Sequence, residues 1–515
     1  MSLGTFDRTA NIDSLSAGRF DVLVIGGGIT GAGVALDAAA RGLRTALVER
    51  DDFASGTSSR SSKLVHGGLR YLQNGDVRLV YEALHERQRL LRNAPHLVTV
   101  LPFLIPVFTG KGGIIPKQVA RALGSAMWMY DLTGGLRIGK VHRRLKADAA
   151  RAHVPTLDDR LAWAYLYYDA QTDDARLTLA IARTAALDFG ATVANHAPVT
   201  ALVKDGDRVT GAVVETGAGQ IEVAARVVVN ATGVWADDVR SLDDRTRPRT
   251  IRPAKGIHIT VPWDKVRNDI AAVVPVPKDR RSVFVVPWPG DDGTVGGPGS
   301  VTYVGTTDTD YQGDVDDPQC TPDDVAYLLD ALNRSLREPL GPGDVLATWA
   351  GLRPLVSDAT SDRTADLSRR HRVTTSPGGM VTVTGGKLTT YREMAEDAVD
   401  AAVAALGDPL PRRAGRSRTR RLALRGADGW EEARAADRHL AERYGGEAGV
   451  LDAMVAADPD LAAPLVPGLP YRRVEALYAV RYEMATSLDD VLSRRTRARL
   501  LAREATAVHA EDVAA

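Results

Sequence analysis

Cysteine is almost missing from this sequence of 515 residues, in which Cys320 is the single example. One cysteine excludes an intramolecular disulfide and any cysteine-rich zinc or iron–sulfur site. We therefore expect a reducing, cytoplasmic compartment and no metal site. If the chain performs redox chemistry, that chemistry needs an organic cofactor.

Long apolar runs and a targeting segment are also missing. Residues 1–20 contain no basic segment followed by an apolar run, so no secretory signal is visible. The longest apolar stretch, residues 98–108, is too short to span a bilayer and contains Pro102 and Pro106. We expect a chain that does not cross a membrane.

Neither sign of charge is in excess, because 65 Lys and Arg side chains balance 65 Asp and Glu side chains. No overall field attracts nucleic acid, so we expect no nucleic-acid partner, and any anion site must be local. With 44% apolar and 25% charged residues the composition is that of ordinary folded proteins. A chain of this length is too long for one compact core, so we expect two or three domains.

A βαβ unit is predicted near the start of the chain. Residues 21–25 are a short β-branched run, residues 29–41 have the Ala-rich pattern of a helix, and residues 45–48 form a second strand. A strand, a glycine-rich turn, a helix and a second strand within about 30 residues predict a parallel sheet.

A glycine fingerprint lies inside this unit. Gly26, Gly28 and Gly31 form the pattern G-x-G-x-x-G, and Glu49 follows the second strand. The glycines permit a tight turn and a close approach of the backbone to a pyrophosphate, whose charge the helix N-terminus favours. An acidic residue at the strand end binds both ribose hydroxyls and disfavours a phosphorylated ribose. The fingerprint predicts a dinucleotide site, disfavours NADP, and leaves NAD and FAD open.

Two later strands end in small residues and favour FAD. Residues 227–230 run into Ala231, Thr232 and Gly233, and residues 380–384 run into a second group. The second group is Gly385, Gly386, Lys387, Leu388 and Thr389. The N-terminus of the helix expected at 391–406 would stabilise the negative charge of a reduced flavin ring. A simple tight turn is the alternative at each place.

The predicted fold class is α/β, with a Rossmann-like FAD-binding domain, an antiparallel β substrate domain and a C-terminal helical domain. Residues 101–168 are rich in prolines, aromatics and basic residues, and short strands split by Pro and Gly recur at 251–307. A basic linker at 412–421 precedes helical spacing at 430–444 and 472–504. We expect the FAD-binding domain at 15–100, 169–250 and 350–410, the substrate domain at 101–168 and 251–349, and the helical domain at 411–515.

Longer motifs are more specific than the glycine fingerprint. They are TSSRSSKLVHGGLRYL at 57–72, DDARL at 173–177, NATGVW at 230–235, KGIH at 255–258, GTTD at 305–308, GLRPL at 351–355 and GGKLTTYR at 385–392. Together they resemble the FAD-dependent glycerol-3-phosphate dehydrogenases, a branch of the DAO-like flavin amine and alcohol oxidases. Residues 481–497 resemble the helical cap of that family, so the resemblance covers nearly the whole chain.

The resemblance implies a function. Its members bind FAD and oxidise sn-glycerol 3-phosphate to dihydroxyacetone phosphate, with hydride transfer to FAD and electrons passed to a quinone. Oxidases of the same family use oxygen and often have an extra segment, which this sequence lacks, so a dehydrogenase is favoured. An amine or amino-acid oxidase on the same fold and a non-catalytic flavin-binding sensor remain alternatives. The formation of a homodimer stays open.

The substrate side of the site needs cations and a base. Oxidation of a phosphorylated secondary alcohol requires removal of a hydroxyl proton and fixed cations for the phosphate, for which Arg is favoured by its planar fork. By similarity, Arg70, Tyr71, Arg353 and Lys387 are the substrate-phosphate and polarising groups. A solvated surface charge is the alternative for any single Arg.

Two histidines are candidates for the base, because a neutral imidazole takes up a proton near pH 7. His258 lies on an expected substrate-domain strand, and we expect it to act as the base or as a substrate ligand. His66 is expected to line the flavin ring system. A buried, hydrogen-bonded side chain is the alternative for each. The expected catalytic residues are His258, Arg353 and Lys387.

Hydroxyl side chains and glycines follow the second strand. The hydroxyls are expected to bond to an FAD phosphate or to the flavin edge, and an ordinary serine-rich loop is the alternative. The expected cofactor-binding residues of this segment are Thr57, Ser58, Ser61, Ser62, His66, Gly67 and Gly68.

A mixture of apolar, aromatic and basic residues after position 100 fits a peripheral membrane contact. It comprises residues 101–108, Lys111, Lys117, Val119, Arg121, Met127 and Trp128. Such a contact would place the cytoplasmic protein on the inner face of the cell membrane. A buried element of the substrate domain is the alternative.

Overall fold

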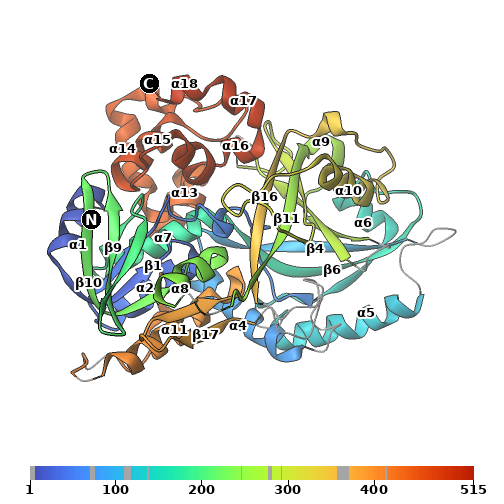
Figure 1. Ribbon diagram of the computed structural model, residues 1–515. Helices are drawn as coiled ribbons and strands as arrows, with labels where there is room; N and C mark the ends of the chain where they lie inside the picture. Colours follow the sequence, from blue (N-terminus) through green and yellow to red (C-terminus); the bar gives the residue numbers. More distant parts are fainter. Residues whose placement is uncertain are drawn as a thin grey trace.

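The computed structural model describes residues 6–514 apart from ten internal gaps and consists of two sheets side by side with a helical domain above them (Figure 1). The undescribed internal residues are 70–75, 109–116, 136–137, 245, 247, 277–280, 291–292, 357–369, 408 and 412–413, and the side chains of 117–123. Arg70, Tyr71 and Lys111 therefore lie outside the described residues.

The first sheet contains the predicted βαβ unit. Its strands, in order across the sheet, are β17 (Arg372–Thr375), β18 (Val381–Thr384), β10 (Gly219–Asn230), β1 (Arg19–Ile25), β2 (Thr45–Val48) and β7 (Thr192–Ala194), and β8 (Val199–Asp205) and β9 (Arg208–Thr216) continue from β10. Strands β18, β10, β1, β2 and β7 are parallel, as the fingerprint predicts.

Helices bury one face of this sheet. They are α2 (Ile29–Ala40), α7 (Asp174–Leu187) and α11 (Tyr391–Leu406), with α1 (Arg8–Ala17) and α8 (Ala236–Asp243) nearby. Alanines and glycines let α2 pack closely between its neighbours, since a Cβ at Gly33 would lie 2.8 Å from the Tyr391 ring. The predicted helix at 391–406 is confirmed with these bounds.

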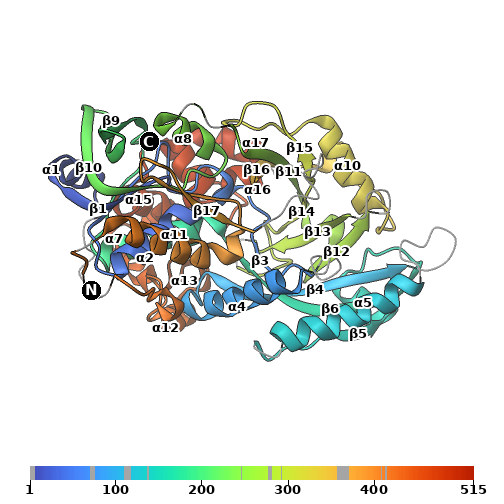
Figure 2. The ribbon, with the colours of Figure 1, turned by 60° about the horizontal axis from the view of Figure 1, so that its bottom comes forward.

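The second sheet is mostly antiparallel, as expected for the substrate domain. Its strands, in order, are β15 (Thr309–Asp310), β11 (Ile251–Pro262), β14 (Val301–Gly305), β13 (Arg281–Trp288), β12 (Ala271–Val276), β4 (Val98–Phe108), β6 (Leu161–Thr172) and β3 (Leu64–Val65), while β16 (Ala347–Val356) pairs with β11 and β5 (Arg143–Lys146) with β6. Its helices are α4 (Val77–Asn93), α5 (Lys117–Tyr130), α6 (Ala147–His153), α9 (Trp263–Val266) and α10 (Pro322–Asn333). Figure 2 shows α4 and α5 along one edge of the molecule and α10 on the opposite side of the sheet.

Strand pairing in the second sheet brings three of the family-like motifs together. In β11, Gly256 of KGIH is opposite Gly351 of GLRPL, and His258 is opposite both Trp349 of β16 and Gly305 of GTTD. Residues 350–356, expected in the FAD-binding domain, belong to β16, which pairs with β11 of the second sheet. The remaining domain boundaries stay a prediction.

The C-terminal residues form the expected helical domain, drawn in red in Figure 1. Its helices are α12 (Trp430–Ala436), α13 (Arg438–Tyr444), α14 (Ala448–Ala457), α15 (Arg473–Tyr482), the π-helical turn η11 (Asp490–Arg495), α16 (Ala498–Leu501), α17 (Arg503–Val508) and α18 (Ala510–Ala514). Buried ion pairs join this domain to the first sheet. Arg176 of α7 pairs with Glu483 at 2.7 Å, and Arg495 pairs with Asp52 at 2.6 Å.

The apolar stretch at 101–108 is a mostly buried element of the second sheet, which is the alternative that the sequence left open beside a membrane contact. It lies within β4, which is paired with β6 on one side and β12 on the other, and most of its side chains are buried. Met127 is also fully buried. Among the described residues, no helix is long and apolar enough to cross a bilayer.

Candidate active site

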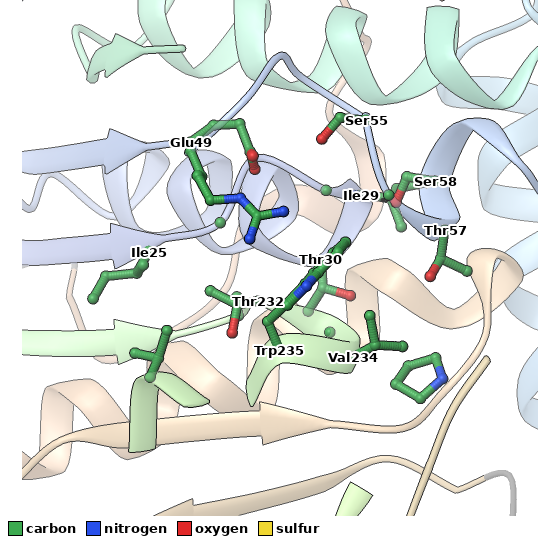
Figure 3. A pocket seen from close by; sticks show the side chains of 18 of the residues that line it. Ile25, Ile29, Thr30, Glu49, Ser55, Thr57, Ser58, Thr232, Val234 and Trp235 are labelled. Atoms are coloured by element: carbon green, nitrogen blue, oxygen red, sulfur yellow. Dashed lines mark hydrogen bonds between the residues drawn. The ribbon is translucent and has the colours of Figure 1, made fainter. Parts of the chain in front are cut away.

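A cavity of about 350 Å³ opens where the parallel strands of the first sheet end (Figure 3). Its walls come from the fingerprint turn, the end of β2, the segment 55–58, the NATGVW turn after β10 and the GGKL turn after β18. Carboxyl ends of parallel strands form the usual crevice for a nucleotide in such sheets. The predicted cofactor residues that line it are Gly26, Gly28, Glu49, Thr57, Ser58, Ala231, Thr232, Gly233, Gly385, Gly386, Lys387 and Leu388.

The fingerprint glycines are required by close backbone packing. Gly26 has a φ of 110°, and a Cβ there would lie 2.7 Å from the carbonyl oxygen of Ala231. A Cβ at Gly31 would collide with the carbonyl oxygen of Gly26, although Gly31 is not among the cavity-lining residues. Gly28 caps α2 and faces the cavity, where a Cβ would lie 3.1 Å from Ser58 Oγ.

Glu49 lies at the end of β2 with its carboxylate held by backbone amides. Gly27 N donates to Oε2 at 2.5 Å, and Asp51 N donates to Oε1 at 2.9 Å. Burial raises the pKa of this carboxyl group, and the two amide hydrogen bonds act in the opposite direction. The carboxylate is thus fixed at the cavity wall, at the position where the fingerprint predicts contact with a ribose.

Arg50 and Trp235 line this cavity, although neither was among the predicted site residues. The Arg50 guanidinium lies over the Trp235 ring, 4.8 Å from its centroid. Asp316, which follows β15, accepts hydrogen bonds from Arg50 at 2.8 Å and from Trp235 Nε1 at 2.7 Å. Trp235 ends the NATGVW motif, which was the available signal. These three side chains connect the loop after β15 of the second sheet to the first sheet beside the cavity.

A second cavity of about 190 Å³ adjoins the first and shares lining residues with it, including Ile29, Pro354 and Lys387. The walls combine β11 and β16 of the second sheet with the segments 57–66 and 386–389. Its predicted residues are Thr57, Ser58, Ser61, Ser62, His66, His258, Arg353, Gly386, Lys387, Leu388 and Thr389. Tertiary folding therefore gathers His258, Arg353 and Lys387 around one space.

His258 is 2% exposed and stacks on the indole of Trp349, with ring centroids 4.7 Å apart and an interplanar angle of 7°. Its Nε2 is 2.9 Å from Ser62 Oγ. Burial, together with the positive charges of Lys63 and Arg353, lowers the pKa of His258 well below its ordinary value. The imidazole is therefore neutral at pH 7, as a proton acceptor must be.

The GTTD motif holds the guanidinium of Arg353. Nη1 donates to the Thr307 carbonyl at 3.1 Å and to Asp308 at 3.3 Å, and Nη2 donates to Thr306 Oγ1 at 3.2 Å. A Cβ at Gly256 would lie 2.7 Å from Arg353 Nη2, so the glycine of KGIH makes room for this side chain. The three motifs thus orient one cation at the second cavity.

Several hydroxyls predicted to bind the cofactor have partners within the protein. Thr57 Oγ1 donates to the Leu352 carbonyl at 2.6 Å, which joins the 57–72 motif to GLRPL. Ser58 Oγ accepts from Ile29 N at the start of α2 at 2.9 Å. Ser61 Oγ donates to Asp174 at 2.6 Å. Ser58 therefore lies at the helix N-terminus, where the fingerprint predicts a phosphate.

His66 is held against the GGKLTT segment. Its backbone N donates to Thr389 Oγ1 at 3.2 Å, so the two longest motifs meet at the second cavity. Gly67 donates its N–H to Tyr130 Oη at 3.0 Å, and a Cβ at this position would collide with Leu84. Gly68 has a φ of 78°. Neither glycine is among the residues lining the two cavities, so close packing explains Gly67 and backbone conformation explains Gly68.

The geometry defines a class of protein. A glycine-lined crevice at the ends of parallel strands, with a fixed acidic residue at its wall, fits the ADP portion of a dinucleotide. The adjoining cavity, with a neutral imidazole and oriented cations, fits a small substrate beside the reactive ring. Such an arrangement is that of a two-domain dinucleotide-dependent oxidoreductase.

Comparison with known proteins identifies the family within this class of oxidoreductases. Residues 21–392 match the family of FAD dependent oxidoreductases, and residues 417–515 match the C-terminal domain of alpha-glycerophosphate oxidase. Glycerol-3-phosphate dehydrogenase 2 of Mycobacterium tuberculosis is 42% identical over 96% of this chain and 84% of its own length. The mitochondrial glycerol-3-phosphate dehydrogenase of Homo sapiens is 40% identical over 93% of this chain and 67% of its own.

Solved structures of similar fold support the same family. The glycerol-3-phosphate dehydrogenase from Bacillus halodurans in complex with FAD superposes with a TM-score of 0.74 and 30% identity, covering 98% of this chain and 93% of that one. Glycine oxidase from Geobacillus kaustophilus, at 21% identity and a TM-score of 0.54, shares the fold over 75% of this chain and 95% of its own. The chain therefore belongs to the FAD-dependent oxidoreductase family, in the branch of the glycerol-3-phosphate dehydrogenases, and its cofactor is FAD.

Proposed function

We propose that this enzyme oxidises sn-glycerol 3-phosphate to dihydroxyacetone phosphate. The observation that supports this most directly is the second cavity, in which His258, Arg353 and Lys387 face a space next to the cofactor crevice. A small phosphorylated alcohol has the two features that these residues recognise, a hydroxyl proton and a dianion. The names of the relatives of similar length agree with this substrate.

The protein side chains divide the work. Bound FAD supplies the acceptor for the hydride that leaves the substrate carbon. Neutral His258 accepts the hydroxyl proton, and Arg353 and Lys387 bind or polarise the charged end of the substrate. Arg70 and Tyr71, in the same motif as His66, are proposed to complete the substrate site by similarity, because they lie outside the described residues.

We further propose that the electrons leave the enzyme to a quinone. Support comes from the absence in this sequence of the extra segment expected of oxygen-using oxidases. An oxygen-dependent glycerol-3-phosphate oxidase is the competing proposal, favoured by the match of residues 417–515 to the C-terminal domain of such an oxidase. Reoxidation of the reduced enzyme with a soluble quinone analogue and with oxygen, compared at equal concentrations, separates the two. A faster reaction with oxygen would contradict the quinone proposal.

The test of the substrate uses the visible spectrum of the purified, FAD-loaded protein without oxygen. Addition of glycerol 3-phosphate is expected to bleach the oxidised flavin bands, whereas sarcosine or D-amino acids leave them unchanged. Bleaching by an amine but not by glycerol 3-phosphate would instead assign an amine or amino-acid oxidase. A spectrum unchanged by any of these compounds would favour a non-catalytic flavin-binding sensor.

We also propose a peripheral contact with the inner face of the cell membrane. The support lies at the end of α5 and in the turn after it, where Trp128 is 62% and Leu132 is 69% exposed and Met129 is also exposed. Exposed basic residues Arg143 and Arg144 follow on β5. An apolar and aromatic surface near cations is typical of interfacial binding to anionic lipid.

A further inference from the structure

The hydroxyl of Ser62 lies between the second cavity and the imidazole of His258. Ser62 is half-buried and lines the cavity, and its Oγ is 2.9 Å from Nε2 of the histidine. The histidine itself is 2% exposed, and its Nδ1 is shielded from solvent with no hydrogen-bond partner among the described residues. His258 also lines the cavity, but its Nε2 is already hydrogen-bonded to Ser62 and a ring nitrogen makes one such bond, so a ligand bonds to Nε2 through the serine hydroxyl unless that hydroxyl moves.

Aromatic side chains connect the histidine ring to the serine's loop. Trp349 stacks on His258 and also donates from Nε1 to the Ser61 carbonyl at 3.4 Å. Tyr303, whose ring centroid is 6.4 Å from that of His258, donates from its hydroxyl to the Ser62 carbonyl at 3.0 Å. The plane of the imidazole and the backbone of the loop are thus positioned by the same two side chains.

One carboxylate holds the residues on both sides of Ser62. Asp174 Oδ2 accepts from the Ser61 backbone N at 3.0 Å and from its hydroxyl at 2.6 Å. Asp174 Oδ1 accepts from Lys63 Nζ at 2.8 Å. Lys63 has a left-handed φ of 55°, and its backbone N donates to Ser61 Oγ at 3.0 Å. Movement of the Ser62 hydroxyl away from His258 would disturb this set of hydrogen bonds.

The carboxylate is in turn anchored by the C-terminal domain. Asp174 and Lys63 are both buried, and Arg497 bonds to Asp174 and, at 2.6 Å, to Asp173. Breaking a buried, hydrogen-bonded ion pair leaves an uncompensated charge, so such a group holds its geometry strictly. This arrangement orients a loop of which only Ser62 presents its hydroxyl to His258.

We propose that Ser62 is a catalytic residue that passes the substrate's hydroxyl proton to Nε2 of His258, with Asp174 as its positioning residue. The inference rests on the proposed oxidation of glycerol 3-phosphate. The substrate O–H bond breaks as its proton bonds to Ser62 Oγ, while the hydrogen of Ser62 moves to Nε2. The carbon that bears this hydroxyl loses a hydride to FAD, which is the oxidant, and its C–O bond becomes a carbonyl. Ser62 ends unchanged and His258 gains one proton.

The geometry meets the requirement for transfer through an intervening hydroxyl. Hydrogen-bond distance between acceptor and donor is the first condition for a general base, and transfer through one bridging group is an accepted route. The imidazole tautomer with its hydrogen on Nδ1 leaves the Nε2 lone pair directed at Ser62.

The test compares the FAD-loaded native protein with Ser62→Ala and Ser62→Thr in anaerobic stopped-flow reduction by glycerol 3-phosphate. Since general base catalysis contributes about 10²- to 10⁴-fold, Ser62→Ala is expected to lower the limiting rate of flavin reduction by about 100-fold. FAD content and the substrate dissociation constant should stay unchanged. Ser62→Thr keeps a hydroxyl and should retain most of the rate. Ser59→Ala, buried in the same loop outside both cavities, is the matched control and should behave like the native protein.

A second variant identifies the partner of Ser62. When two residues act as a unit, removing the second after the first costs little. His258→Gln alone is expected to slow flavin reduction at least as much as Ser62→Ala, and the double variant should be no slower than His258→Gln. If the fold-decrease in flavin reduction rate of the double variant equals the product of the two single decreases, the residues act independently and the shared proton route is wrong.

Other outcomes also overturn the inference. A limiting rate for Ser62→Ala within about twofold of the native rate would mean that the substrate reaches His258 directly. Loss of FAD from Ser62→Ala would instead assign the hydroxyl to the cofactor. If glycerol 3-phosphate does not bleach the flavin of the native protein, the proposed function is wrong. If it bleaches the native protein and Ser62→Ala equally fast, only the proton route is wrong, so the two failures are distinguishable.

Discussion

Arg353 and His258 differ in how the surrounding residues prepare them for chemistry. Arg353 is oriented by hydrogen bonds to the GTTD segment, whereas His258 is kept neutral by burial and by nearby positive charges. A cation fixed in direction suits a phosphate, and a neutral imidazole suits a proton. The role of Arg353 can be tested by a substitution that keeps its charge but changes its geometry, and the role of His258 by a change in the charge beside it.

Replacing Arg353 by Lys keeps the charge but removes the planar fork and at least one hydrogen bond. A charge-assisted hydrogen bond contributes about 1.5 to 3 kcal/mol, so we expect a loss of about 10- to 150-fold in kcat/KM for glycerol 3-phosphate with the flavin retained. The control substrate is glycerol, which lacks the phosphate and should be affected much less. Native kinetics, or loss of FAD, would make Arg353 a structural or cofactor-side cation. The same expectation applies to Arg70→Lys.

The pH dependence of flavin reduction reports on His258. The lowered pKa means that the imidazole loses its proton below its ordinary value of about 6.5, so the rate should stay constant from about pH 6.5 to 8 and fall only at lower pH. Lys63→Met removes a positive charge and should raise the His258 pKa, which moves the acidic limb to higher pH. Lys63→Arg keeps the charge and is the control. An acidic limb above pH 6.5 in the native protein would speak against His258 as the base.

Gly28→Val is expected to abolish retention of FAD. A Cβ at this position already lies 3.1 Å from Ser58 Oγ, and the two methyl groups of Val would extend into the crevice where the backbone must approach the pyrophosphate. The measurement is the ratio of flavin to protein absorbance after gel filtration. Recovery of a fully flavinated variant would refute the placement of the pyrophosphate.

At the scale of elements, the C-terminal domain stabilises the loop that follows β2. Asp52, three residues after Glu49, accepts hydrogen bonds from Arg494 Nε at 2.7 Å and from both terminal nitrogens of Arg495. Asp52, Arg494 and Arg495 are all buried. The turn η11 is therefore coupled through one carboxylate to the loop that follows Glu49 at the wall of the cofactor crevice.

Asp52→Asn should reduce the free energy of unfolding by up to about 3 kcal/mol, because buried Arg495 loses its closest counter-charge and, among the described residues, keeps only Glu483 at 3.8 Å, whereas Arg494 keeps Asp489 and Asp490. Denaturant unfolding of the FAD-loaded protein measures the change. The matched control is Arg499→Ala, which breaks an exposed pair with Asp489 and should cost less than about 1 kcal/mol. Equal stabilities of the two variants would show that Asp52 does not hold the domains together.

At the scale of the whole molecule, the exposed apolar residues Trp128, Met129 and Leu132 lie together at the edge that α5 forms. Figure 2 shows α5 along the outside of the second sheet, away from the first sheet. The cofactor crevice lies at the strand ends of that first sheet. Trp128 and Leu132 project from the end of this helix and from the following turn. A membrane surface could therefore contact this edge while the nucleotide crevice stays clear of it.

The double variant Trp128→Ser, Leu132→Ser is expected to weaken binding to vesicles that contain anionic lipid, since each buried apolar side chain contributes about 1.5 to 3 kcal/mol. Flotation in a density gradient measures the bound fraction. Lys117→Glu, Arg121→Glu tests the electrostatic part. The control is Arg334→Ala, which breaks an exposed pair with Asp330 at the C-terminal end of α10. Equal flotation of all variants, or none by the native protein, removes the membrane proposal.

The sequence by itself determined the βαβ frame, the glycine turn and the presence of a dinucleotide site, because these depend on local backbone conformation, whereas the choice of FAD over NAD came from the longer motifs. Gly26 has a positive φ, which glycine adopts readily. A β-branched run followed by glycines predicts the end of a strand whatever the tertiary surroundings of the segment are. Motif resemblance also named His258 and Arg353, but as separate positions in the chain. Only the tertiary structure placed both at one cavity, by pairing β11 with β16.

Long-range contacts decided the remainder of the site. Asp174 meets Lys63 across 111 positions of sequence, Arg497 meets Asp174 across 323, and Ser62 meets His258 across 196. Residues 101–108 likewise became a buried strand because β6 and β12 pair with them, although their composition also fitted a membrane contact. Such outcomes depend on which surfaces the folded chain brings together, and no local pattern of residue types encodes that choice.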